Sequence, residues 1–276
     1  MRIVLSRKGF DSVNGGIPSP IMPDGTLLSF PIPSEDGNTT YHDIYYQGKS
    51  YYEIIQELSP TAAKKLENSK CHVDPDLLYR YKKEVADWKP AFGQSRESQI
   101  HLENHNISVG DMFLFYGWFR QTGYDSSGKL HFVKPKNDFT PDRHVIFGYM
   151  EIGEVIEDQT VIESKYKWHP HALKNELNNV LYVPKEQCSL GDNKKGYGLL
   201  KYTPIRQLTK EGYKRSEWIL PPCLHNAKIT FHESDSYGWK NDFEYFHSAR
   251  IGQEFIILKD VDGELKNWLL DIISQG

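Results

Sequence analysis

Short aromatic and β-branched runs fill the second half of the chain, and they constrain its fold more than any other feature. Seven such runs, each bounded by turn residues, cover residues 112–119, 144–156, 179–183, 196–202, 217–221, 228–231 and 254–258. Runs of this length and composition predict β-strands. Helical patterns do not alternate with them, so a doubly wound βαβ sheet is excluded and a largely antiparallel or mixed sheet is expected.

The first half of the chain combines strand, loop and helix signals. Residues 2–5 and 26–33 predict two strands, and the Gly-, Pro- and Ser-rich residues 6–25 between them predict a loop. Apolar residues at helical spacing predict helices within residues 50–88, the second of them capped by Asp74 before Pro75. Residues 95–104 and 264–274 predict two more helices. The expected fold is α+β: a curved, largely antiparallel or mixed sheet with helices inserted after the second strand and a C-terminal helix.

Composition narrows the class of protein. With 38% hydrophobic and 25% charged residues, the chain can bury a substantial core. We expect a single domain over residues 1–276, because neither a low-complexity linker nor a repeat divides the chain. A net charge of -4 excludes a chain-wide positive field for nucleic acid or membranes. Three widely spaced cysteines and no long apolar segment predict a cytoplasmic protein that does not bind membranes, of undetermined oligomeric state.

The predicted loop after the first strand contains the densest set of reactive side chains. Residues 6–12 bring two cations, a carboxylate and two hydroxyl groups to a strand end, where sites are commonly built. Asp11 supplies the carboxylate. The same pattern also fits a solvated turn in which Asp11 bonds to its own backbone.

Two histidine-containing motifs could be metal sites. HVDPD offers His72, Asp74 and Asp76, but a helix cap at Asp74 and a favourable helix dipole for Asp76 explain that motif more simply. In WHPH, His169 and His171 lie one residue apart without a carboxylate to complete a metal shell. Because no zinc spacing and no common nucleotide or dinucleotide fingerprint occurs, we expect no metal and no other cofactor.

Other candidates are single amide, imidazole, aromatic or guanidinium groups near the ends of predicted elements. Amides and imidazoles can bond base edges, and a cation beside an aromatic ring can hold a nucleotide. Each of these groups also occurs in proteins with a purely structural role, either holding a loop by hydrogen bonds or lying on a solvent-exposed face. The residues are Gln94, Gln99, His101, Trp118, Arg120, Arg250 and Gln253.

About nine short motifs are familiar as an ordered set. They are LSRKGFDS, GGIPSPIMPDG with LLSFPIP, HVDPD, FGQ with QIHL, GDMFLFYGWFR, HVIFGY, WHPH, NVLYV and GQEF. By their order and spacing, the chain resembles the nucleotide modification associated domain family, in its third type, over nearly its full length. The resemblance implies an association with modified bases in DNA, in prokaryotic and phage conflict settings. It does not fix the reaction.

Excision is the reaction on a modified base that requires the fewest functional groups. It requires a carboxylate near the sugar and a donor to the departing base. We therefore predict a DNA glycosylase, a hydrolase that flips a hypermodified base such as glucosylated hydroxymethylcytosine out of phage DNA and leaves an abasic site, in antiviral defence. The alternatives are a transferase that installs or alters such a base, a non-catalytic module that binds modified DNA, and an enzyme acting on free nucleotides.

The excision hypothesis assigns a role to each candidate residue. Asp11 is the first candidate for the catalytic carboxylate, and Asp76 and Asp24 are the next candidates. Lys8 either contacts a phosphate or forms a Schiff base with the sugar, which would nick the strand. The remaining contacts to DNA phosphates are assigned to Arg7, Arg120 and Arg250. Contacts to the base are assigned to Phe10, Gln94, Gln99, His101, Trp118, His169, His171 and Gln253.

Overall fold

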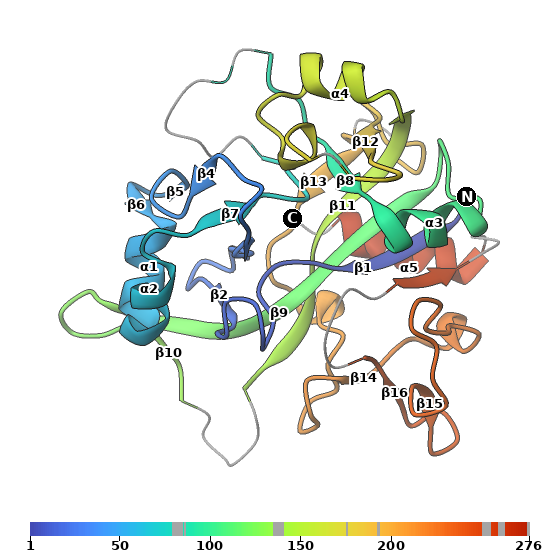
Figure 1. The fold of residues 1–276 in the computed structure, drawn as a ribbon. Helices are drawn as coiled ribbons and strands as arrows, with labels where there is room; N and C mark the ends of the chain where they lie inside the picture. The colour runs from blue at the N-terminus through green and yellow to red at the C-terminus, as the bar shows by residue number, and fades with distance from the viewer. Residues whose placement is uncertain are drawn as a thin grey trace.

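A large mixed sheet forms the centre of the protein. The computed structural model describes residues 1–78, 85, 87–134, 141–174, 176–191, 194–249, 255–258 and 263–274. The strands of the sheet follow the order β17-β1-β9-β11-β12-β8, and β2, β10 and β13 pair alongside. Their bounds are β1 Ile3–Arg7, β2 Ser19–Ile21, β8 Phe92–Gln94, β9 Met112–Tyr124, β10 Leu130–Phe132, β11 Arg143–Ile156, β12 Val180–Pro184, β13 Tyr197–Leu199 and β17 Phe255–Leu258. The sheet curls into a half-barrel (Figure 1).

The two longest strands, β9 and β11, carry the curvature. They pair in antiparallel register, and the register shifts between Ile146 and Gly148. A second shift between Ile152 and Glu154 lies in the pairing of β11 with β12. Because β-bulges bend a strand and increase its twist, these shifts allow the sheet to curl. β1 runs parallel to β9 and antiparallel to β17, which makes the sheet mixed.

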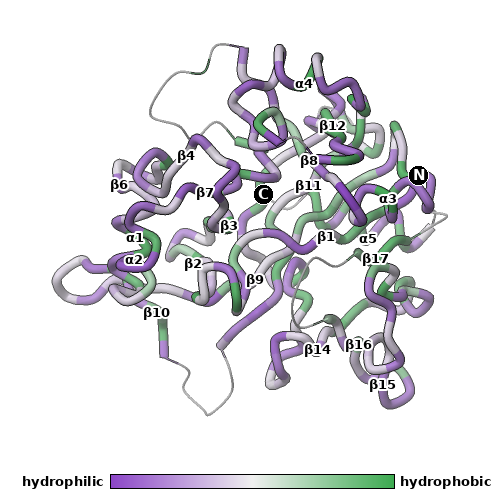
Figure 2. The backbone as a smooth tube through the Cα atoms, in the orientation of Figure 1, coloured by the Kyte–Doolittle hydropathy of each residue, from purple (hydrophilic) through white to green (hydrophobic). Residues whose placement is uncertain are grey.

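Both faces of the sheet are buried, which explains the continuous apolar runs in its strands. Met112 and Leu114 belong to one hydrophobic cluster, whereas Phe113 and Phe115 belong to another. The first cluster includes the apolar face of α5 (Gly263–Ser274), and the second includes Leu102 of α3 (Arg96–Asn104). Figure 2 shows hydrophobic segments concentrated in and around the sheet, with hydrophilic ones at the periphery.

A smaller unit with its own hydrophobic cluster packs beside the sheet. Its helix α1 (Tyr51–Leu58) begins at a capping box formed by Ser50 and Glu53, and α2 (Pro60–Leu66) follows with Ser59 as its cap. Its strands are β3 Ile32–Pro33, β4 Thr39–Thr40, β5 Tyr45–Tyr46, β6 Lys49–Ser50 and β7 Lys70–His72. Because β7 ends at His72, this unit leads the chain directly to the HVDPD motif.

The remaining elements complete the outer layers. A three-stranded sheet pairs in the order β14-β16-β15. The bounds are β14 Glu217–Trp218, β15 Gly238–Lys240, β16 Tyr245–His247, α4 Gln159–Lys165, and three 3-10 turns at Pro170–Ala172, Pro204–Arg206 and Pro222–Leu224. Among the described residues, no helix has both the length and the apolar character needed to cross a membrane.

The predicted fold class is confirmed, including the C-terminal helix, but four local predictions are wrong. Residues 26–33 form a strand only at Ile32–Pro33, and the predicted loop 6–25 contains β2, which pairs with β9. Residues 228–231 make only an isolated bridge, between Ile229 and Ile256 of β17. Asp74 does not cap a helix: residues 74–78 are non-helical, and residues 79–84 and 86 of the predicted helix lie outside the described residues.

Candidate functional site

A polar cavity of about 410 Å³ lies where the end of β1, the end of β7, the β8–α3 junction and the turn before β12 meet. In the strand order, β9, β11 and β12 separate β1 from β8, so it is the curl of the sheet that brings the ends of β1 and β8 to one cavity. The residues that line the cavity come from segments 7–14, 32–34, 72–74, 93–98 and 171–176. Distant parts of the sequence therefore share one site.

Asp74 is the central carboxylate of the cavity, with a side chain only 2% exposed. Its Oδ1 accepts a 2.8 Å hydrogen bond from the Gly93 N–H and lies 3.5 Å from Nε2 of His169. Its Oδ2 lies 3.7 Å from both Nζ of Lys8 and Nε2 of His72. Burial opposes the charge, yet the contacts with His169, His72 and Lys8 outweigh it and hold the pKa of Asp74 well below its ordinary value. Asp74 is therefore ionised at neutral pH.

Lys8 faces Asp74 from the opposite side of the cavity. Its Nζ lies 4.4 Å from the centre of the Phe92 ring, and its side chain is 11% exposed. Burial lowers the pKa of Lys8 to about 8, and the attraction of Asp74 offsets only part of this shift. The cavity thus contains a buried ammonium group whose nearest carboxylate is Asp74.

His171 has a fixed orientation and a fixed tautomer. The Nδ2 of Asn179 donates to the backbone oxygen of His171 at 2.8 Å and to Oε1 of Gln159 at 2.7 Å, which uses both amide protons. Oδ1 of Asn179, 2.6 Å from Nδ1 of His171, must therefore accept a proton from that nitrogen. Burial lowers the pKa values of both His171 and His72, so both rings are neutral. The lone pair of His171 is on Nε2.

Gln94 completes the wall of the cavity at the end of β8. It is 4% exposed, and among the described residues its Nε2 has no hydrogen-bond partner. The next residue, Ser95, donates its hydroxyl to Glu176 and makes no side-chain cap on α3. A buried amide donor without a partner costs free energy unless a ligand or water satisfies it. Gln94 is therefore a candidate ligand-recognition group of the cavity.

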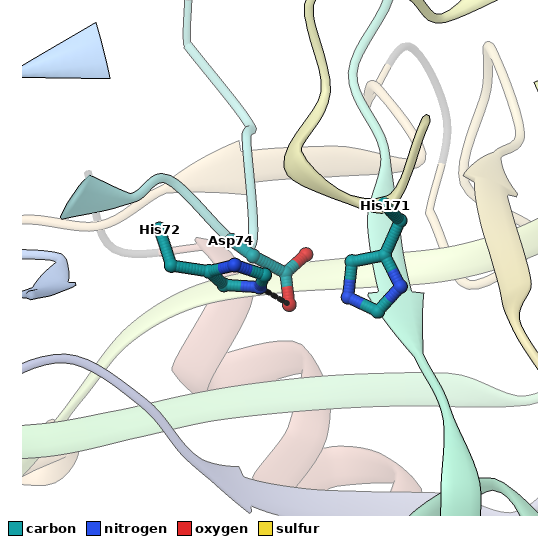
Figure 3. A group of neighbouring side chains, drawn as sticks. All are labelled: His72, Asp74 and His171. Carbon is teal, nitrogen blue, oxygen red and sulfur yellow. Dashed lines mark ion pairs between the residues drawn. The ribbon is translucent and has the colours of Figure 1, made fainter. Parts of the chain in front are cut away.

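The same cavity contains one set of side chains that could hold a metal ion. One ligand atom from each of His72, Asp74 and His171 lies within 4.8 Å of the other two (Figure 3). The close-up shows the Asp74 carboxylate between the two imidazole rings.

Comparison with known families gives an independent result. The sequence profile described as nucleotide modification associated domain 3 matches residues 2–258. The chain belongs to this family. Neither the curated proteins nor the solved structures gave a match. The predicted family is thus confirmed, and its description associates this nucleotide modification associated domain with nucleotide modification.

Five of the residues predicted from sequence line the cavity of this nucleotide modification associated domain. They are Arg7, Lys8, Asp11, Gln94 and His171. The carboxylate of Asp11 accepts bonds from the backbone of residues 13 and 14 and from the side chain of Asn14, so it stabilises its own turn. Arg7 is 7% exposed and donates to the backbone oxygen of Ala249. His169 lies behind the wall, next to Asp74.

Three predicted base-binding residues have partners elsewhere in the protein and do not line the cavity. Phe10 packs on Phe30 and Tyr41. The side chain of Gln99 is bonded to Glu103 and Tyr182. His101 lies 3.0 Å from the hydroxyl of Thr230 and stacks on Phe255. These positions give the three side chains structural partners instead of a ligand.

Three more predicted residues, among those that the structure describes, are also outside the cavity wall. Asp76 is 1% exposed and accepts a bond from the Trp88 indole. Arg120 is paired with Asp142, and the guanidinium of Arg215 covers Trp118 at 4.1 Å. Arg250 and Gln253 lie outside the described residues, so their predicted roles stay predictions.

Several residues of this site were not selected from the sequence. Asp74 was interpreted as a helix cap, and Asn179 as the first residue of a strand. Gly93 leaves room for the imidazole of His171, since a Cβ there would lie 2.2 Å from the ring. The sequence did contain one signal for the site. The HVDPD motif supplies the carboxylate that the histidines of the WHPH motif lack for a metal shell.

Proposed function

We propose that this protein hydrolyses the N-glycosidic bond of a modified base in DNA, with Asp74 as the catalytic carboxylate. The observation that carries the proposal is a buried, ionised carboxylate in the wall of a cavity that also contains an unpartnered amide donor, Gln94. The family description supports a substrate related to nucleotide modification. The preferred substrate is a bulky, hydroxyl-bearing base such as glucosylated hydroxymethylcytosine, removed from phage DNA in antiviral defence.

The reaction follows from charge placement. As the bond from C1′ to the base nitrogen breaks, positive charge develops on the sugar and the electron pair goes to the base. The Asp74 carboxylate stabilises that charge and takes a proton from the water whose oxygen adds to C1′. The proton taken by Asp74 passes through solvent to the leaving base, which returns Asp74 to its ionised form, and Gln94 donates to the edge of that base. The products are the free base and an abasic site.

The size and lining of the cavity suit an extruded, substituted base. Its volume of about 410 Å³ falls in the range of small-molecule sites. The hydroxyl groups of Ser34, Ser95 and Ser98 and the side chain of Asn14 lie along its wall. Such groups can exchange hydrogen bonds with a sugar adduct and so offset the few kcal/mol that base extrusion costs. Lys174 and Arg96 at the same wall supply cations for flanking phosphates.

We also propose that residues 1–276 act as one cytoplasmic domain. Support for a single unit comes from the pairing of β1 with β17, which joins the two ends of the chain in one sheet.

The test uses purified protein and two DNAs of identical sequence, one containing glucosylated hydroxymethylcytosine and one unmodified. Released small molecules are identified by mass spectrometry, and abasic sites are counted, with and without a chelator and without added cofactor. We expect free modified base and abasic sites from the modified DNA only. Intact DNA would refute excision. Base alteration that requires a second soluble substrate would indicate a transferase, and binding without release a recognition module.

Two matched variants locate the carboxylate. Asp74→Asn and Asp11→Asn each remove one charge from the same cavity wall and preserve the size of the side chain. We expect Asp74→Asn to slow base release by about 10²–10⁴-fold and Asp11→Asn to have little effect. The reverse pattern would return the catalytic role to Asp11. Circular dichroism of both variants, together with retained binding of the modified DNA, separates lost catalysis from lost folding.

A further inference from the structure

We propose that His72, Asp74 and His171 together bind one divalent transition-metal ion, with Zn²⁺ as the first candidate. Their ligand atoms lie within 4.8 Å of one another, and they come from β7, from the segment after it, and from the 3-10 turn before β12 (Figure 3). Two imidazole nitrogens and one carboxylate oxygen are a common donor set of catalytic zinc and non-haem iron sites. Asp76, considered in the sequence as a ligand, is not part of this set.

The surroundings of His171 are those of a metal ligand. In metal sites, the imidazole nitrogen that does not bind the ion usually donates its proton to an oxygen atom, which orients the ring. Nδ1 of His171 donates in this way to Asn179, whose amide is held in turn by Gln159. Nε2 therefore offers a lone pair toward the cavity.

Asp74 is oriented in the same manner. Oδ1 receives the hydrogen bond from Gly93 and lies beside His169. Nδ1 of His169 accepts from the backbone N–H of His171, so the proton of His169 is on Nε2, the nitrogen that lies 3.5 Å from Oδ1 of Asp74. Oδ2 is left to face Lys8 and His72 at 3.7 Å, a separation longer than a hydrogen bond. One carboxylate oxygen is anchored, and the other is available to a cation.

Three protein ligands leave a coordination position open. The ligands line the 410 Å³ cavity, so a water or a substrate atom could occupy that position. Lys8 also lines this cavity, and its charge opposes a second cation near Asp74. Binding of the ion stands without the proposed function, whereas an ion-bound water as the attacking nucleophile rests on it. In the ion-bound form Asp74 would hold the ion, and the bound water would release its proton to solvent in place of the proton transfer to Asp74.

The experiment measures metal binding by the full chain after treatment with EDTA and dialysis. We expect one Co²⁺ per chain, with the visible absorption of a low-symmetry site, and displacement of Co²⁺ by one equivalent of Zn²⁺. Mg²⁺ should not compete, because it prefers oxygen ligands. In the Co²⁺ form, paramagnetic NMR should show two strongly shifted exchangeable imidazole protons, and the one of His171 should exchange slowly. This measurement requires no variant, so it remains decisive if variants unfold.

Variants test the ligand set. We expect His171→Ala to weaken Co²⁺ binding at least about 100-fold and Asn179→Leu about 10–100-fold, whereas the exposed His131→Ala changes nothing. Lys8→Met should tighten binding several-fold. Absence of the Co²⁺ spectrum, or equal affinity in wild type and His171→Ala, would overturn the site. Metal binding without base release would refute only the proposed function, and base release unchanged by metal removal would refute only the role of the ion as a source of the nucleophile.

Discussion

Replacement of Gly93 by alanine tests whether the position of His171 matters for stability and function. A Cβ at residue 93 would lie 2.2–2.6 Å from Cδ2, Cγ and Nε2 of the His171 ring. Because non-bonded carbon atoms prefer about 3.5–4.0 Å, the ring would have to move by about 1 Å or more. It is 3% exposed, and its Nδ1 is bonded to Asn179 at 2.6 Å. The alternative, a shift of β8, would disturb its pairing with Leu181.

The magnitude follows from two contributions. Overpacking a buried position costs about 1–3 kcal/mol. Separation of the His171 imidazole from Asn179 leaves two buried polar groups without partners, at about 1–3 kcal/mol. We therefore expect Gly93→Ala to lower the free energy of unfolding by about 2–5 kcal/mol and to abolish detectable base release.

Urea unfolding followed by circular dichroism measures the first effect, and mass spectrometry of released base the second. Gly123→Ala is the matched control, because a Cβ there has its nearest neighbours at 3.7 and 3.9 Å. The double variant Gly93→Ala/His171→Ala should recover at least half of the lost stability but no activity. Wild-type stability and activity in Gly93→Ala would refute the argument that His171 is rigidly held.

Three further outcomes are expected. Burial lowers the pKa of His101 to about 4 from an ordinary 6.5, so its contribution to stability is present above pH 6.5 and is lost as the pH falls toward 4. Urea unfolding measures the free energy of unfolding at pH 7 and at pH 4. Between these two values, His101→Gln should lose about 1–2 kcal/mol less of this free energy than wild type, allowing for partial exposure of the ring. Borohydride should trap no covalent adduct between the protein and abasic DNA, because water is the proposed nucleophile; an adduct abolished by Lys8→Met would assign the attack to Lys8. Ser50→Ala should lower the free energy of unfolding by about 1 kcal/mol in urea, since the capping box of α1 is lost; an unchanged midpoint would contradict that role.

The strands of the central sheet were predictable because their environment is uniform. β9 and β11 are buried on both faces, so their apolar runs identify them without knowledge of a partner. The run at residues 228–231 also contains β-branched and aromatic residues, yet only Ile229 makes a bridge, to Ile256. Local composition measures how well a segment suits a strand, and the available neighbours decide whether it pairs.

The candidate site was predictable residue by residue but not as a set. Lys8, Gln94 and His171 were selected for their chemistry and do line one cavity. Asp74 was assigned to a helix cap because Asp before Pro is a strong local signal. The chain does not continue as a helix there, and the carboxylate turns instead to the N–H of Gly93, 19 residues later.

The sequence by itself determined the family, the α+β class, the main strands and a chemical inventory of carboxylates, histidines and amides. These properties depend on composition and order along the chain. Only the tertiary structure decided which carboxylate meets Lys8, which nitrogen of His171 is free, and why residue 93 is glycine. Those outcomes depend on contacts between segments up to about a hundred residues apart, and no local pattern encodes a distance across the fold.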